Sequence, residues 1–214
     1  MFTVQDIQEL RNRTGAGLMD CKKALQEKDG DLEKAVEYLR EKGMAAVAKK
    51  AGRIAAEGAV FSYIHFGGRI GVLVEVNCET DFVAREETFQ QFGKDIAMQI
   101  AASNPQYVAE ADVPDSVLEK EREVQRAACV SEGKPDAVID RIVEGKINKF
   151  LNEICLLRQA FIKNPDITIS DYLNEMTLKI GEKLSIRRFQ RFEMGEGLEK
   201  RQDNFVDEVM GSIK

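Results

Sequence analysis

A short segment, residues 77–84 (NCETDFVA), places a carboxylate beside a bulky aromatic ring where a predicted strand gives way to a predicted helix. Such a junction presents side chains outward from a rigid base. Two interpretations of Asp81 and Phe82 are open. In the first, Asp81 caps the helix and Phe82 packs onto it, on the same stripe as Phe89. In the second, both side chains protrude and insert into a binding partner. Spacing alone favours the first interpretation.

The only histidine, His65, and the thiol of Cys78 are the candidates for nucleophilic catalysis. A β-hairpin through this region places His65 beside roughly Ile70. At about 3.3 Å per strand residue, Cys78 then lies well beyond hydrogen-bond reach of the imidazole. We therefore expect His65 to be a strand-end or surface residue and not half of a Cys–His catalytic pair.

Residues 187–192 (RRFQRF) alternate arginines with phenylalanines, a pattern that also suits stacking on nucleic-acid bases. An acidic run follows at once, with Glu193, Glu196 and Glu199. We favour an edge strand whose arginines face water or pair with carboxylates. The sequence contains neither a G-x-x-x-x-G-K-[ST] loop nor a G-x-G-x-x-G fingerprint, so we expect that the chain does not itself bind a nucleotide.

The cysteines point to a reducing environment. Four of them occur without a C-x-x-C pair, and a single histidine leaves no cluster with zinc-like spacing. We interpret all four as reduced core residues. No disulfide framework, metal or cofactor is expected.

Charge is distributed unevenly along the 214 residues, which carry a net charge of −6. Residues 1–53 hold 11 basic and 9 acidic groups, whereas residues 54–214 hold 20 and 28. An acidic body argues against binding to nucleic-acid phosphates and favours protein partners or small molecules. Apolar stretches fall short of the ~18 residues that a membrane span needs, and the N-terminus lacks the apolar run of a signal peptide. We expect a cytoplasmic protein without a membrane or nucleic-acid partner.

The first 43 residues predict three short amphipathic helices. Thr3 caps the first helix, Gly15 and Gly17 end it, and Asp31 caps the third. Three apolar stripes bury one another in a small three-helix module. Residues 44–57 (MAAVAKKAGRIAAE) follow without a bulky apolar stripe, and we favour a solvated helical linker over a lipid- or RNA-binding helix.

Beyond the linker the hydrophobic period changes from helical to two. Residues 60–65 and 70–76 predict a β-hairpin that turns on Gly67 and Gly68. Few strands among many helices predict an α+β core over residues 58–200 with a small antiparallel sheet. The other predicted elements are a helix with the stripe Phe89, Phe92, Ile96 and Ile100, helices near 114–132 and 138–151, an extended segment over 156–162 that stops at Asn164 and Pro165, a helix over 168–180 capped by Ser170, a third strand over 184–194, and a C-terminal helix within 201–214.

Three ordered motifs resemble the bacterial elongation factor Ts family over nearly the whole chain. They are residues 10–25 (LRNRTGAGLMDCKKAL), residues 77–84, and residues 191–197 (RFEMGEG) with 205–209 (FVDEV). The resemblance implies a ubiquitin-associated-like three-helix domain, a linker helix and an α+β core. It also implies the short form with a single core subdomain, members of which act as homodimers.

The function implied by this resemblance is nucleotide exchange on elongation factor Tu, in both its GDP-bound and its nucleotide-free state. The family's segment corresponding to Thr80, Asp81, Phe82 and Val83 inserts into the partner's G domain and dislocates its magnesium ion. Lys23, His65 and Ile162 match further contact regions, although Ala160 replaces the family's usual proline near Ile162. No bond-making chemistry is needed, so the resemblance does not imply an enzyme.

Two rival classes remain open from the residues themselves. One is a helical adaptor, in which residues 1–53 bind ubiquitin-like or nascent-chain partners and the core is a scaffold. The other is a thiol enzyme that uses Cys78 and His65. Exchange activity that requires the core excludes the adaptor, and tolerance of Cys78→Ser excludes the thiol enzyme.

Overall fold

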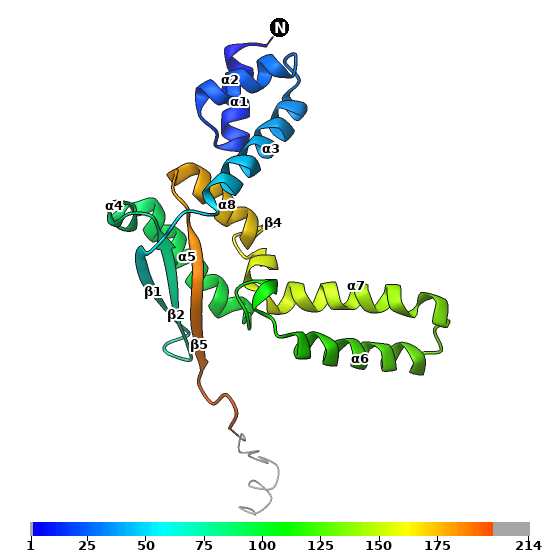
Figure 1. Ribbon diagram of the computed structural model, residues 1–214. Coiled ribbons are helices and arrows are strands. Elements are labelled where there is room, and N and C mark those ends of the chain that lie inside the picture. Colours follow the sequence, from blue (N-terminus) through cyan, green and yellow to red (C-terminus); the bar gives the residue numbers. More distant parts are fainter. Residues whose placement is uncertain (1, 199–214) are drawn as a thin grey trace, which may run out of the picture.

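A computed structural model describes residues 2–198 of the chain and begins with three packed helices (Figure 1). They are α1 (Val4–Thr14), α2 (Leu18–Glu27) and α3 (Leu32–Lys50). The hydroxyl of Thr3 accepts a hydrogen bond from the Asp6 N–H and the Asp6 carboxylate accepts one from the Thr3 N–H, which closes a capping box. Asp31 caps α3. The predicted module is confirmed, with its own core of Leu10, Cys21, Ala24, Leu25 and Ala35.

The segment expected as a separate linker helix continues α3 instead. Helix α3 runs without a break to Lys50, and residues 51–56 belong to no helix. Alanines and lysines are good helix formers, and no capping residue interrupts them. Buried Gly43 lets α3 approach α8 (Ile169–Ile180), since a Cβ there would lie 2.8 Å from Leu178 Cδ1. The division into residues 1–43, 44–57 and 58–200 stays a prediction.

Three antiparallel strands form the sheet of the core, in the order β1–β2–β5. They are β1 (Glu57–His65), β2 (Ile70–Cys78) and β5 (Ser185–Glu193). The turn between β1 and β2 carries positive φ angles at Phe66, Gly67 and Gly68, which glycine adopts without strain. The predicted hairpin and third strand are confirmed.

Helix α5 (Glu87–Ser103) covers one face of this sheet (Figure 1). Each large apolar side chain buried there stabilises the fold by about 1.5–3 kcal/mol. The predicted stripe on α5 is confirmed, and it meets the inward side chains of β1 and β2. The main residues of this contact are Phe61, Val72, Val74, Val76, Phe89, Phe92, Ile96 and Ile100.

Along the chain, the remaining elements of the core come between strand β2 and strand β5. Helix α4 (Asp81–Arg85) follows β2 directly. Helices α6 (Asp115–Ser131) and α7 (Asp136–Ile154) pack together as a hairpin that extends away from the sheet (Figure 1). Two short strands, β3 (Ala160–Phe161) and β4 (Asn164–Thr168), precede α8. Single-turn helices occupy Glu110–Asp112 and Leu156–Arg158.

Three local expectations were wrong, and a fourth falls outside the described residues. The segment over 156–162 is a strand only at Ala160–Phe161, because Leu156–Arg158 form a single-turn helix. The chain does not end its extended conformation at Asn164 and Pro165, because strand β4 begins at Asn164. A proline is tolerated there because β4 lies at the edge of a two-stranded sheet. Helix α8 is capped by Thr168 and not by Ser170, since Thr168 forms a capping box with Asp171. The predicted C-terminal helix within 201–214 lies outside the residues described.

Two helical glycines give a test of the packing between α5 and the sheet. A Cβ at Gly93 would collide with the Phe61 ring, whereas a Cβ at exposed Gly145 meets nothing within 4 Å. We expect Gly93→Ala to lower the free energy of unfolding by about 1–3 kcal/mol. Gly145→Ala should raise it by about 0.5–1 kcal/mol through helix propensity. Urea denaturation measures both, and equal effects would contradict the packing described.

Candidate partner-binding site

The segment that joins β2 to α5 carries an exposed aromatic ring. Thr80 caps α4, its hydroxyl accepting a hydrogen bond from the Val83 N–H at 3.4 Å. Val83 and Ala84 turn into the core, whereas the Phe82 side chain is 76% exposed. We call residues 80–83 the tip.

The interpretation in which Phe82 packs on the helix stripe is wrong. Phe89 is fully buried while Phe82 lies in water. The reason is local, because α4 ends after one turn and Glu86 adopts an extended conformation that interrupts the helical register. Asp81 does not cap the helix either, and its carboxylate pairs with Arg85 at 2.6 Å.

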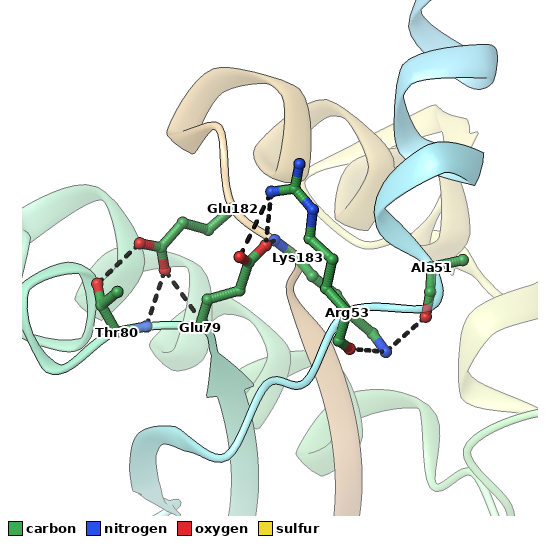
Figure 2. Close-up of polar contacts among 6 residues, drawn as sticks. All are labelled: Ala51, Arg53, Glu79, Thr80, Glu182 and Lys183. Atoms are coloured by element: carbon green, nitrogen blue, oxygen red, sulfur yellow. Dashed lines mark hydrogen bonds and ion pairs between the residues drawn. The ribbon is translucent and has the colours of Figure 1, made fainter.

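A carboxylate from a distant part of the chain holds the base of the tip (Figure 2). Glu182 lies in the turn between α8 and β5. One of its oxygens accepts hydrogen bonds from the N–H groups of Glu79 and Thr80, at 3.1 and 3.0 Å. Its other oxygen accepts one from the Thr80 hydroxyl at 2.7 Å. Charge-assisted hydrogen bonds of this kind are about twice as strong as neutral ones.

A second carboxylate links the same turn to the connector that follows α3 (Figure 2). Glu79 accepts a hydrogen bond from the Lys183 N–H at 2.6 Å and pairs with Arg53 at 3.2 Å. The Lys183 N–H, and after it the Arg53 guanidinium, hold the pKa of Glu79 below its usual range. The ammonium group of Lys183 donates to the carbonyl oxygens of Ala51 and Arg53. Three chain segments therefore meet at this point.

Cys78 and His65 lie at opposite ends of the β1–β2 hairpin. His65 pairs with Ile70, whereas Cys78 pairs with Glu57. The His65 imidazole contacts the Tyr63 hydroxyl at 3.0 Å, and the buried Cys78 thiol donates to the Thr80 carbonyl oxygen at 3.1 Å. The separation expected from hairpin geometry is confirmed, and the Cys–His enzyme is excluded.

The arginines of β5 pair with carboxylates, as predicted. Arg187 and Arg188 both contact Glu75, at 2.8 and 2.7 Å, and Arg191 contacts Glu193 at 2.9 Å. Within residues 2–198, β5 pairs only with β2, so it forms an edge of the described sheet. Its arginines lie on this edge as members of ion pairs.

The other residues suggested by the resemblance lie apart from the tip. Lys23 is exposed on α2 within the helical module. Ile162, 40% exposed, lies between β3 and β4, and its N–H donates to the side-chain oxygen of fully buried Gln99 at 2.9 Å. The same Gln99 donates to the Ala160 carbonyl oxygen, so a buried amide fixes this turn.

Sequence reasoning missed Glu182, Lys183 and Gln99. Their partners lie roughly 60 to 130 positions away along the chain. No local period or spacing marks such a residue. Over residues 2–198, no group of His, Cys, Asp and Glu side chains is arranged to hold a metal ion. In that same span, none of the helices is long and apolar enough to cross a membrane.

Comparison with known proteins identifies the family. A family model described as elongation factor TS matches residues 5–196. Elongation factor Ts of Carboxydothermus hydrogenoformans is 61% identical over 214 residues, covering 100% of this chain and 99% of its own. Those of Geobacter sulfurreducens and Thermoanaerobacter sp. are 61% and 62% identical, covering 97% and 93% of this chain and 96% and 98% of their own.

These relatives, together with the α+β fold, define a translation elongation factor. The chain belongs to the elongation factor Ts family.

Burial and the nearby negative charge of Glu182 raise the pKa of Cys78 to about 11 from an ordinary 9.0. The Cys78 thiol therefore ionises appreciably only as the pH rises toward 11. At pH 8 the fraction of Cys78 present as thiolate is about 100-fold smaller than that of a free thiol. We expect iodoacetamide to modify Cys78 at least about 100-fold more slowly in the native protein than in urea at equal pH. Peptide mass mapping measures this, and labelling at the rate of free cysteine would contradict it.

Proposed function

We propose that this protein is a guanine nucleotide exchange factor that binds GDP-bound elongation factor Tu, displaces its magnesium ion and promotes GDP release. The observation that carries the proposal is the Phe82 ring, 76% exposed on a tip that is fixed at its base. A large apolar side chain held in water contributes little to its own fold. Its presence is best explained by burial in a partner.

The physical basis is differential binding. A G protein holds GDP partly through a magnesium ion that bridges phosphate and protein oxygens. A factor that binds the nucleotide-free state more tightly must weaken nucleotide affinity by the same factor, because linkage is reciprocal. Such a factor makes and breaks no covalent bond, so it is not an enzyme in that sense. Its partners are both states of elongation factor Tu, in the cytoplasm.

The size of the effect follows from the ring. Burying a phenylalanine that is otherwise exposed contributes about 1.5–3 kcal/mol. Each 1.4 kcal/mol changes an equilibrium constant about tenfold. If Phe82 is buried only in the complex that releases nucleotide, it therefore supplies a preference of about 10- to 100-fold for that state.

Further contacts extend this interface. Asp81 and Val83 flank Phe82 in the chain, with Val83 buried in the core and Asp81 paired with Arg85. Lys23 on α2 and Ile162 between β3 and β4 are exposed. We include them, and His65, as secondary contacts. Their separation from the tip favours a broad interface on the partner.

The tip is tested by Phe82→Ala. We expect the variant to stay folded and to slow GDP release from elongation factor Tu at least about tenfold, because the exposed ring is lost without a change in the core. Stopped-flow release of a fluorescent GDP measures the rate. Val130→Ala, which trims another exposed apolar side chain far away on α6, is the control and should release GDP like the unmodified protein. An unchanged rate in folded Phe82→Ala would sink the proposal.

We also propose that two copies pair through the outer face of the sheet, opposite α5. Val60, Ile64, Leu73 and Phe192 are each at least 50% exposed on this face. The strand register places Gly71 between Ile64 and Phe192, with Leu73 two residues along β2, so these three side chains form one patch, while Val60 lies beside Glu75 at its border. Soluble domains rarely leave such patches open. Charges of both signs border the patch, since Glu75 lies beside Arg187 and Arg188. A border that carries both signs suits an identical partner related by a two-fold axis.

A charge placed on this face tests the dimer. We expect light scattering behind size exclusion to give about twice the 24.0 kDa chain mass for the unmodified protein. Phe192→Asp should give a single chain, because an unpaired carboxylate would be buried between the copies. Val130→Asp adds the same charge on α6 and should remain a dimer. A monomeric unmodified protein would rule the pairing out.

A further inference from the structure

The turn between α8 and β5 contains a carboxylate that accepts hydrogen bonds from Thr80 of the tip and from Glu79, the residue before it. We propose that Glu182 is a positioning residue for nucleotide release, which acts through Thr80 to hold Phe82 in its productive orientation. This inference rests on the proposed exchange function and names a residue that the motif at 77–84 does not contain.

Glu182 is committed to the base of the tip. Its three hydrogen bonds go to the N–H groups of Glu79 and Thr80 and to the Thr80 hydroxyl, at 2.7–3.1 Å (Figure 2). Among the described residues it forms no ion pair, although cationic Lys183 follows it directly. The negative charge of Glu182 is therefore compensated by the N–H groups of Glu79 and Thr80 and by the Thr80 hydroxyl. Lys183 instead turns its ammonium group to the connector after α3.

Thr80 transmits this anchoring to the ring. Its hydroxyl donates to Glu182 and accepts from the Val83 N–H, while its carbonyl oxygen accepts from the Cys78 thiol. Thr80 is thus held at its N–H, its hydroxyl and its carbonyl oxygen. Helix α4 has only five residues, too few to persist without outside support. Its orientation, and that of Phe82, depends on these anchors and on burial of Val83.

Loss of the carboxylate should loosen the tip without removing the ring. Without Glu182, the N–H groups of Glu79 and Thr80 lose their acceptor, and the cap loses its bracing. Phe82 would then sample several orientations, and insertion of the ring during nucleotide release would have to order it. Contacts elsewhere on the interface would still form the complex. The expected defect lies in the release step more than in affinity.

The variants are matched to this geometry. Glu182→Ala removes all three hydrogen bonds. Glu182→Gln keeps an oxygen for the two N–H groups and is the conservative rescue. Lys183→Met removes the ammonium contacts to the connector but keeps the N–H that donates to Glu79, so it controls for general damage to the turn.

The experiment measures GDP release from elongation factor Tu against the concentration of each variant. We expect Glu182→Ala to lower the maximal rate at least about fivefold and to change the half-saturating concentration less than about twofold. Glu182→Gln should recover to within about twofold of the unmodified protein, and Lys183→Met should keep the maximal rate. In a Phe82→Ala background, Glu182→Ala should cause no further loss, because both act through one ring.

Amide hydrogen exchange on the same variants separates positioning from general stability. Glu182→Ala should expose the amides of Thr80 and Glu79 and leave those of α5 protected. An unchanged maximal rate, an additive loss in the Phe82→Ala background, or loss of protection throughout α5 would each overturn the inference. If Phe82→Ala slows GDP release while Glu182→Ala releases GDP at the normal rate, only the inference fails. If Phe82→Ala itself is normal, the proposed function fails first.

Discussion

The Phe82 ring lies in water on a backbone segment that is held by hydrogen bonds and not by packing of the ring. Phe82 makes no contribution to the core, yet it lies one residue from buried Val83. The hydrogen bonds from Glu79 and Thr80 to Glu182 supply the constraint that side-chain packing cannot. They span more than a hundred positions of chain, so the geometry of the tip depends on a contact with the turn that precedes β5.

The same turn also holds the segment that carries the helical module. Glu182 binds the end of β2, while Lys183 binds the connector after α3, and Arg53 in that connector pairs with Glu79. The contact of α3 with α8 at Gly43 adds a second attachment. The helical module and the tip are therefore both attached to the turn between α8 and β5. A partner that touches both, as proposed for Lys23 and Phe82, would meet two surfaces whose spacing is set in advance, which lowers the entropy cost of binding.

Local patterns predicted most of the fold. The hairpin, the α5 stripe and the caps at Thr3 and Asp31 each depend on residues close in sequence, and each is confirmed. Spacing alone favoured the wrong orientation of Phe82, because the break at Glu86 interrupts a helical register that looks continuous in sequence. The close approach of α3 to α8 depends on Gly43 packed against Leu178, and the role of Glu182 depends on pairing across the whole core. Non-local contacts have no periodic signature, so no window of sequence contains them.

Ile162, the second apolar residue proposed as a contact, follows the same physical logic as Phe82. Ile162 projects from a turn between two very short strands, and the buried amide of Gln99 holds that turn through the Ile162 N–H and the Ala160 carbonyl oxygen. Near it, the Asp95 carboxylate accepts from Lys163 and Tyr172, and burial, with the negative Asp95 carboxylate next to it, raises the pKa of Tyr172. In both places an exposed apolar residue, proposed as a contact, is held by a polar side chain of another element. Polar groups suit this task because a hydrogen bond has direction, whereas apolar packing fixes volume. In the proposed interface, the residues that set its shape would therefore be polar side chains at its base, which need not touch the partner at all.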